Sequence, residues 1–260
     1  MKKRVSIDLA LILVWPLVAT LLSFLVKPNA LGSIIIFLLV PAIYLSVRGK
    51  EYVKKAAVFS LIVGIPVMIV LDYIAQVSGS WIMYPVSILP FKFFGIVTLE
   101  IILWAVFTCY FIIIFYEYFI NHHATKYFWK SKMKYLLTVV LTLFTLFVLF
   151  YFASPSSLKI PYFYLLWGVV LLLIPFLLYL LKYPKTTSKF FLAGAYFFYL
   201  HFIYEVAALK LGWWVFPSVE FIGWVSVFGV SFPLEEVIFW FILLALTTVA
   251  AYELFDDDNR

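Results

Sequence analysis

The sequence predicts an all-α, polytopic membrane bundle of about eight transmembrane helices. Of its 260 residues, 66% are hydrophobic and only 12% are charged, whereas a soluble domain needs far more polar surface. Apolar runs recur along the whole chain, and each is long enough to cross a hydrocarbon core about 30 Å thick. Because these runs leave no room for a sizeable soluble domain, we expect residues 1–260 to form a single membrane domain.

Each predicted span is an apolar run bounded by charged or turn-forming residues. The second span is the shortest and contains Pro41, which favours a tilt or a kink. The predicted spans are Ile7–Val26, Ser33–Val47, Ala56–Ala75, Val97–Phe119, Lys134–Ala153, Ile160–Leu181, Lys189–Ala208 and Phe232–Leu254.

The positions of the basic residues predict the orientation. With a cytoplasmic N-terminus, fifteen of the 19 Lys and Arg residues fall in cytoplasmic segments. This bias is typical of proteins inserted in a cell membrane, and it places both termini in the cytoplasm. The net charge of +6 is therefore interpreted as a topology signal. We expect the chain to be surrounded by membrane lipid and not to bind nucleic acid. The four remaining basic residues are Lys27, Lys92, Lys159 and Lys210.

Several classes of cofactor and metal chemistry lack their usual signals. No Gly-x-Gly occurs, so a flavin or nicotinamide fingerprint is missing, and the paired D-x-x-x-D motifs of diphosphate chemistry are missing too. The single Cys109 and the three His residues are too few for a Cys cluster or a di-iron centre. His201 precedes Glu205 by four residues on one helix face, where a hydrogen-bonded pair is expected. We therefore predict no cofactor and no metal.

The chain contains a weak internal repeat whose halves are about residues 1–125 and 126–260. In the first half, Trp81 and Tyr84-Pro85 lie in a long loop; in the second, Trp213-Trp214 and Phe216-Pro217 do. Upstream of these loops, Asp72 resembles Glu205, and downstream Thr98-Leu99-Glu100-Ile101 aligns with Pro233-Leu234-Glu235-Glu236. Each half holds four spans, an even number, so the two halves are predicted to run parallel in the membrane.

Five acidic residues fall at one predicted depth, near the outer ends of four spans. A carboxyl group at that depth loses water and is repelled by neighbouring carboxylates, so its protonated form is favoured. A protonated carboxyl is what a general acid needs. The helix dipole explains acids at the first turn of a span without any function, but it disfavours Asp72 and Glu205 at helix C-terminal ends. The five candidates are Asp72, Glu100, Glu205, Glu235 and Glu236.

Aromatic side chains are concentrated in and beside the two long loops. One explanation is an aromatic belt at the membrane interface. The other is that some rings face the acids, where an aromatic face stabilises a cation by about 0.5–2 kcal/mol. Acids and aromatic rings in an apolar cavity suit protonation of a C=C bond and stabilisation of the carbocation. The candidate substrate-binding residues are Trp81, Tyr84, Trp213, Trp214 and Phe216.

At these residues the chain resembles the lycopene cyclase domain family, the membrane-embedded, flavin-independent carotenoid cyclases of archaea, bacteria and fungi. The resemblance covers the third, fourth, seventh and eighth spans, in which an acid, a G-x-W-x-aromatic-P-like loop and a P-[LI]-E-E segment follow one another. It implies redox-neutral cyclisation of the ends of lycopene to β-ionone rings, giving β-carotene. Glu235 and Glu236 would be the acid and base candidates, and Glu100 the equivalent acid of the first copy.

The chain also departs from the family pattern. In the first copy, Thr98 stands where the family has proline, and Ile101 stands where the family has the second glutamate. In addition, eight spans are predicted here, whereas about seven are usual in the family. The substrate could therefore be another carotenoid or isoprenoid. A different class of function is a small membrane transporter or scaffold whose carboxylate cluster relays protons.

Overall fold

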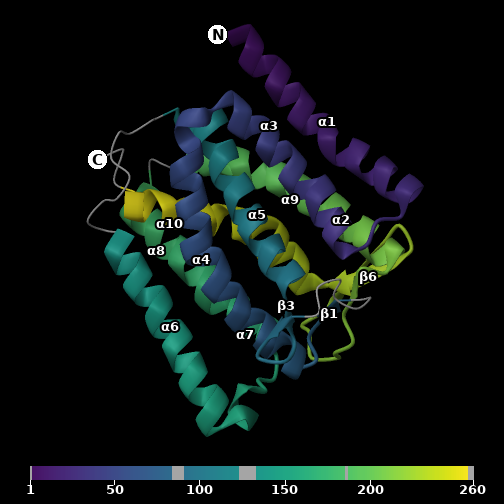
Figure 1. Ribbon diagram of the computed structural model, residues 1–260, viewed down its shortest axis with the longest axis vertical. Coiled ribbons are helices and arrows are strands. Elements are labelled where there is room, and N and C mark those ends of the chain that lie inside the picture. The colour runs from purple at the N-terminus through teal and green to yellow at the C-terminus, as the bar shows by residue number, and fades with distance from the viewer. Residues whose placement is uncertain (1, 84–90, 123–132, 185–186, 257–260) are drawn as a thin grey trace.

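The computed structural model describes residues 2–83, 91–122, 133–184 and 187–256 and confirms the all-α polytopic bundle (Figure 1). Within these ranges, eight helices are long and apolar enough to cross a membrane, so the chain is a multi-pass membrane protein. The spans are Val5–Val26, Ala30–Arg48, Lys50–Val77, Leu99–Asn121, Lys134–Ala153, Phe163–Lys182, Ser188–Leu211 and Glu236–Leu254.

Several spans are built from consecutive helical segments. The first four spans comprise α1 (Lys2–Val26), α2 (Ala30–Ile34), η1 (Ile35–Leu39), α3 (Val40–Arg48), α4 (Lys50–Val77), α5 (Leu99–Tyr116) and η2 (Glu117–Asn121). The last four comprise α6 (Met133–Ala153), α7 (Phe163–Trp167), η4 (Gly168–Leu173), α8 (Ile174–Lys182), α9 (Thr187–Leu211), η6 (Glu236–Leu243) and α10 (Leu244–Asp256), with the short 3₁₀ helix η3 (Pro155–Leu158) after α6.

Short strands lie at one end of the bundle. They form three antiparallel pairs: β1 with β4, β2 with β3, and β5 with β6. We call this the strand end, and the opposite end, where α1 begins and α10 finishes, the termini end (Figure 1). The strands are β1 (Ile82–Met83), β2 (Lys92–Phe93), β3 (Val97–Thr98), β4 (Trp214–Val215), β5 (Trp224–Val227) and β6 (Val230–Pro233).

Proline residues shape the second span of each half. Pro41 and Pro175 each stand two positions after the last residue of a π-helical turn, η1 and η4 respectively. A proline removes a backbone donor and crowds the carbonyl four residues earlier, and the wider π turn relieves both effects. The irregularity expected at Pro41 is therefore present, and the sixth span repeats it.

The predicted starts of the fourth span at Val97 and of the eighth span at Phe232 are wrong. Val97 belongs to strand β3, where it pairs with Phe93, and the helix begins at Leu99. Phe232 and Pro233 belong to strand β6, where they pair with Val225 and Trp224. The first helical turn follows Pro233, and the Leu234 amide is held by the Gly223 carbonyl at 2.9 Å. Apolar character alone did not reveal these boundaries, because a buried strand and a buried helix have the same composition.

The outer helices expose apolar side chains, as helices that face lipid do. Only 17% of the α6 span is buried, compared with 67% of the span that begins at Leu99. Exposed residues on α6 include Leu149 and Phe152. The ribbon shows α6 at the edge of the bundle, beside α4 (Figure 1). The α6 helix is therefore the most loosely enclosed of the eight spans.

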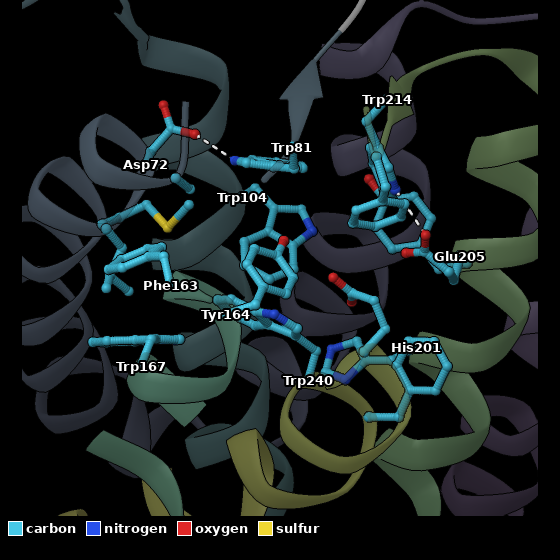
Figure 2. Close-up of a pocket in the computed structure, with 17 residues that line it drawn as sticks. Asp72, Trp81, Trp104, Phe163, Tyr164, Trp167, His201, Glu205, Trp214 and Trp240 are labelled. Atoms are coloured by element: carbon cyan, nitrogen blue, oxygen red, sulfur yellow. Dashed lines mark hydrogen bonds between the residues drawn. The ribbon is translucent and has the colours of Figure 1, made fainter. Parts of the chain in front are cut away.

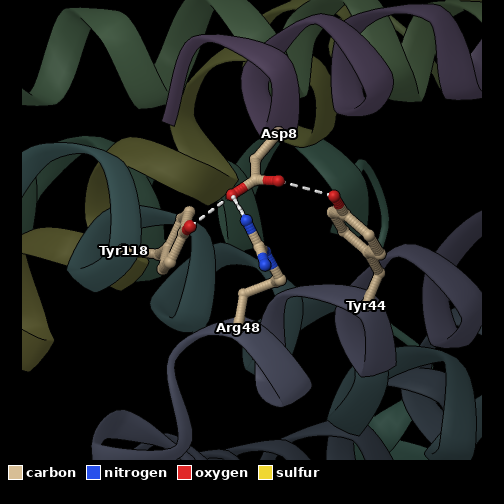
Figure 3. A network of polar contacts seen from close by, with 4 residues as sticks. All are labelled: Asp8, Tyr44, Arg48 and Tyr118. Atoms are coloured by element: carbon tan, nitrogen blue, oxygen red, sulfur yellow. Dashed lines mark hydrogen bonds and ion pairs between the residues drawn. The ribbon is translucent and has the colours of Figure 1, made fainter. Parts of the chain in front are cut away.

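A buried acid ties α1 to the bundle near the termini end (Figure 3). Asp8 is only 1% exposed, and Arg48 donates to its Oδ2 at 2.9 Å. The hydroxyl of Tyr44 donates to Oδ1 at 2.6 Å, and Tyr118 also donates to this carboxyl. Since a carboxylate inside a span is costly unless it is paired, this network accounts for Asp8 structurally.

A second polar network joins the two halves at the termini end. Tyr116 donates to Glu253 at 2.8 Å, and Tyr252 donates to Glu117 at 2.6 Å. The same Tyr-Glu dipeptide thus occurs at the end of the fourth and of the eighth span, and each tyrosine binds the glutamate of the other. This exchange fixes α5–η2 against α10.

Replacing Tyr252 by Phe should therefore lower the free energy of unfolding by about 1–3 kcal/mol, since a buried carboxyl loses a hydrogen-bond donor. Thermal unfolding in mixed micelles measures the change. Tyr199→Phe is the matched control, because the Tyr199 hydroxyl has no hydrogen-bond partner among the described residues. Equal stability of both variants would show that the reciprocal bonds do not hold the halves together.

Candidate functional site

Two buried carboxyl groups near the strand end are held in the same way. The Trp81 indole N–H donates to Asp72 at 3.0 Å, and the Trp214 indole N–H donates to Glu205 at 2.9 Å (Figure 2). Each tryptophan follows its acid by nine residues. Gln76 adds a second donor to Asp72 at 2.6 Å.

The helix ends explain this repetition. Gly79 and Gly212 both have a φ of 70°, which glycine adopts without the penalty that a side chain brings. The amide after each glycine bonds the carbonyl five residues back, which closes α4 and α9 with Schellman motifs. The tryptophan two residues after each glycine then turns back to the acid. Of the two tryptophans in the second loop, Trp214 rather than Trp213 therefore corresponds to Trp81.

Strand pairing brings the two tryptophans together. Strand β1 pairs with β4 so that Ile82 faces Val215 and Met83 faces Trp214. The rings of Trp81 and Trp214 consequently lie 6.1 Å apart, edge to face. The two acid–tryptophan pairs thus come from different halves of the chain and meet at one place.

The two glutamates that open the eighth span have different environments. Glu236 lines the cavity described below and interacts with the Glu205 carboxyl and the Tyr164 hydroxyl. Glu235 is fully buried outside that cavity, where its Oε1 accepts a hydrogen bond from the Ile222 amide at 2.7 Å. Adjacent helical residues point about 100° apart, so the two side chains cannot share one site.

Asp72, Glu205 and Glu236 line one cavity, whose volume of about 50 Å³ admits only the end of a large ligand. Among the described residues, neither Lys nor Arg contributes to its wall. Trp104 and Trp240 are in contact in that wall, 5.7 Å apart between ring centres. The aromatic part of the wall consists of Trp81, Trp104, Phe163, Tyr164, Trp167, His201, Tyr204, Trp214, Phe216, Trp240 and Phe241 (Figure 2).

Two apolar cavities adjoin this one, and Leu71 and Trp167 line all three. The larger has a volume of about 300 Å³ and extends to Phe59 and Ala251. The other, of about 290 Å³, lies between α4, α6 and α7. Along α4, the connected walls run from Ala75 to Phe59, a distance of about 24 Å at 1.5 Å per residue. The acids therefore lie at one end of a row of adjoining apolar cavities.

The structure separates the predicted site residues into groups. Asp72, Glu205, Glu236, Trp81, Trp214 and Phe216 line the cavity. Glu100 and Glu235 are buried but do not line it, and Tyr84 lies outside the described residues. Trp213 packs against Phe37 and donates to the Pro28 carbonyl at 2.8 Å, and it does not line the cavity.

The expected His201–Glu205 hydrogen bond is also wrong. Both ring nitrogens of His201 lack a hydrogen-bond partner, and Glu205 binds Trp214 instead. The fixed direction of the Trp214 indole, set by strand β4, determines which partner the carboxyl takes.

Several wall residues were missed in the sequence, although a signal for two of them exists. Trp104 follows Glu100 by four residues, and Trp240 follows Glu236 by four. This spacing places Glu and Trp on one helix face in each half. When Glu235 is aligned with Glu100, the second half has one more residue before its tryptophan than the first half. The π-helix η6 accommodates this additional residue, because its turns are wider than those of an α-helix.

Trp214→Phe should destabilise the protein by about 1–3 kcal/mol, because the buried Glu205 carboxyl loses the Trp214 indole donor. Trp224 is 47% exposed on strand β5 and serves as the control, where substitution by Phe should change stability by less than about 0.5 kcal/mol. Unfolding midpoints of the purified variants measure both effects. A Trp214→Phe protein as stable as the Trp224→Phe protein would contradict this account of the pair.

No group of three or more His, Cys, Asp or Glu side chains among the described residues is arranged to hold a metal ion. The three carboxyls of the cavity are instead bonded to, or face, indole, amide and phenol groups. Such partners suit proton chemistry at the carboxyl itself.

This chain matches no protein-family model, no curated protein and no solved structure.

Proposed function

We propose that this chain is a membrane-embedded carotenoid cyclase of the lycopene cyclase domain type. It closes the acyclic ends of lycopene to β-ionone rings by acid catalysis, with no change in oxidation state and no cofactor. The observation that carries the proposal is the cavity itself: three buried carboxyls and a wall of aromatic rings, with two apolar cavities adjoining it.

The acids favour proton donation. An ionised carboxylate in an apolar cavity is costly unless a cation compensates it, and no Lys or Arg of the described residues lines this one. Glu205 and Glu236 are also close enough to repel each other when both are ionised. Both effects keep carboxylic acids protonated, which is the form that donates a proton to a C=C bond.

The aromatic wall suits the intermediate that such a protonation creates. A carbocation in hydrocarbon surroundings lacks the water that would stabilise it. The faces of Trp81, Trp104, Trp214 and Trp240 carry negative charge density and can each stabilise a nearby cation by about 0.5–2 kcal/mol. An apolar wall also excludes the water that would otherwise trap the cation.

The adjoining cavities suit a long hydrocarbon chain. They extend along the helices from the acids, and their walls include few polar groups, among them Thr108 and Thr247. Val140 and Leu143 of the loosely enclosed α6 line both apolar cavities. The substrate would therefore enter from the lipid past α6, with its reacting end at the acids and its remaining chain along α4.

The reaction proceeds in three balanced steps. Glu236 donates its proton to the terminal C=C bond of the substrate, whose electron pair forms the new C–H bond and leaves a tertiary cation. The electron pair of an internal C=C bond attacks that cation and closes the ring. Loss of a ring proton, which is returned to the Glu236 carboxylate, converts a C–H bond into the ring C=C bond, so the product is an isomer of the substrate and the acid is restored.

The distribution of Lys and Arg between the two sides of the membrane supports a proposed location and orientation. We place the protein in the cell membrane with both termini in the cytoplasm, so the acid cavity lies towards the extracytoplasmic side. The resemblance of Pro233-Leu234-Glu235-Glu236 and its duplicated surroundings to the lycopene cyclase domain family supports the same function.

Expression of the chain in cells that accumulate lycopene tests the proposal. We expect β-carotene or its half-cyclised precursor to appear in the pigment extract. Unchanged lycopene in cells with well-made, membrane-inserted protein would count against a lycopene substrate. Feeding shorter or hydroxylated isoprenoids to the same membranes would then show whether another substrate is cyclised.

A further inference from the structure

His201 is a buried side chain with unused hydrogen-bonding capacity. It lies on α9, is 5% exposed and lines the acid cavity beside Trp240 (Figure 2). Neither Nδ1 nor Nε2 forms a hydrogen bond. The Trp240 carbonyl in the π-helix η6 and the Phe197 ring, 5.9 Å away, are its close surroundings.

An unpaired buried imidazole needs an explanation. Buried polar groups are nearly always hydrogen-bonded, and leaving one unpaired costs about 1–3 kcal/mol. The acids of the cavity have partners: Asp72 has Gln76 and Trp81, and Glu205 has Trp214. The Trp167 indole N–H is unpaired like His201, but it can only donate a hydrogen bond, whereas an imidazole can also accept a proton. His201 is therefore a polar group of this wall that is left available for a bound molecule.

Its neighbours favour a neutral ring. Glu205 on the same helix and Glu236 on η6 are carboxyls in the same apolar surroundings, which favour their neutral form, and Asp72 and Tyr164 complete the titratable wall. A neutral imidazole carries one N–H and one nitrogen lone pair. With the N–H near the Trp240 carbonyl, the lone pair of the other nitrogen is left for the cavity.

We infer that His201 is the base that removes the ring proton and so ends the cyclisation. This inference rests on the proposed function. The imidazole lone pair forms an N–H bond with the leaving proton, and the electrons of the C–H bond become the ring C=C bond. The first step leaves Glu236 as a carboxylate. The imidazolium then transfers its proton to this carboxylate, which restores both the acid and the base.

The position of Glu235 supports this division of roles. In the sequence, Glu235 and Glu236 are the acid and base candidates, but Glu235 is bonded to the Ile222 amide outside the cavity. His201 instead faces the cavity from a different helix than Glu236. Acid and base on different helices can reach different carbons of one ring, as protonation at one position and deprotonation at another require.

His201→Gln tests the role in the full-length protein. Gln keeps a buried polar group of similar size but cannot hold a proton, so turnover should fall by about 10²–10⁴-fold. The cation that still forms should be captured by water or lose a proton elsewhere, which gives hydroxylated or isomeric products by mass and chromatography. Tyr199→Phe, two residues away on the same helix, is the control and should leave both rate and products unchanged.

A second measurement does not depend on turnover. The chain has three histidines, so His122→Asn with His123→Gln leaves His201 alone for ¹⁵N-histidine NMR in lipid nanodiscs. A neutral ring with one unbonded nitrogen, whose signal moves when lycopene is added, would support the inference.

Three results would overturn the inference. They are a His201 ring that is protonated in the resting protein, a His201→Gln protein with wild-type rate and products, and a His201→Gln protein that is slower but forms only wild-type products. Failure of the proposed function is a different result, because the wild-type protein itself would then leave lycopene unchanged.

Discussion

Glu236→Gln is expected to lower the conversion of lycopene by about 10²–10⁴-fold, the usual contribution of a general acid. Gln matches the shape of Glu but carries no acidic proton for the substrate. It can still face the Tyr164 hydroxyl and the Glu205 carboxyl, so the cavity should stay intact. Pigment extraction from lycopene-producing cells, normalised to the amount of folded protein, measures the loss.

The neighbouring glutamate provides the matched control. In a Glu235→Gln protein, the side-chain oxygen can still accept the hydrogen bond of the Ile222 amide, so conversion should stay close to wild type. The two variants differ by one position and have the same chemistry. Equal loss of conversion in both would contradict the separation of a cavity-lining acid from a loop-binding one.

Gly168→Ala is expected to destabilise the protein by about 1–3 kcal/mol or more, because the site has no room for a methyl group. A Cβ at position 168 would lie 2.1 Å from Cδ2 of Phe239 and 2.2 Å from its Cγ. The Phe239 ring is buried on η6, next to Trp240 of the cavity wall. The substitution should therefore reduce both the unfolding midpoint and the conversion of lycopene.

Gly194→Ala is the control for that substitution. There the new methyl group would lie 2.8 Å from Cδ2 of Leu246, the far end of a flexible side chain that can turn away. We expect a change of less than about 1 kcal/mol. If Gly168→Ala were as stable as Gly194→Ala, the close contact between η4 and η6 would not be a fixed feature of the fold.

The spans were predictable because composition alone determines them. A hydrocarbon core demands helices with about twenty apolar residues, and each predicted span coincides with a helix that is long and apolar enough. The predicted starts at Val97 and Phe232 were wrong, because in both places a strand precedes the helix. Hydropathy carries no information on whether a buried apolar residue belongs to a strand or to a helix.

The site was only partly predictable. Asp72 and Glu205 stood out because acids at helix C-terminal ends need a reason, and both line the cavity. The pairing of each acid with the tryptophan nine residues later depends on a helix end and a strand register, so the sequence did not show that Trp214 rather than Trp213 meets Glu205. The additional residue in η6 was not visible in the sequence either, and Glu236 rather than Glu235 lines the cavity.

The polar networks of the termini end were missed for a different reason. Asp8 looks like one charge near the start of an apolar run, and its partners Tyr44 and Arg48 belong to another span. Glu117 and Glu253 bind tyrosines more than 130 residues away. Contacts between spans leave no trace in the local pattern, although the repeated Tyr-Glu dipeptide was visible in the sequence.

Purified protein in lipid vesicles that contain lycopene as the only added reactant tests the central claim most directly. If protonated carboxyls of the cavity drive the reaction, the wild-type protein should form a cyclic product with the mass of lycopene, and the Glu236→Gln protein should form almost none. Lycopene that stays unchanged with folded wild-type protein, or a product that both proteins form at the same rate, would contradict the account.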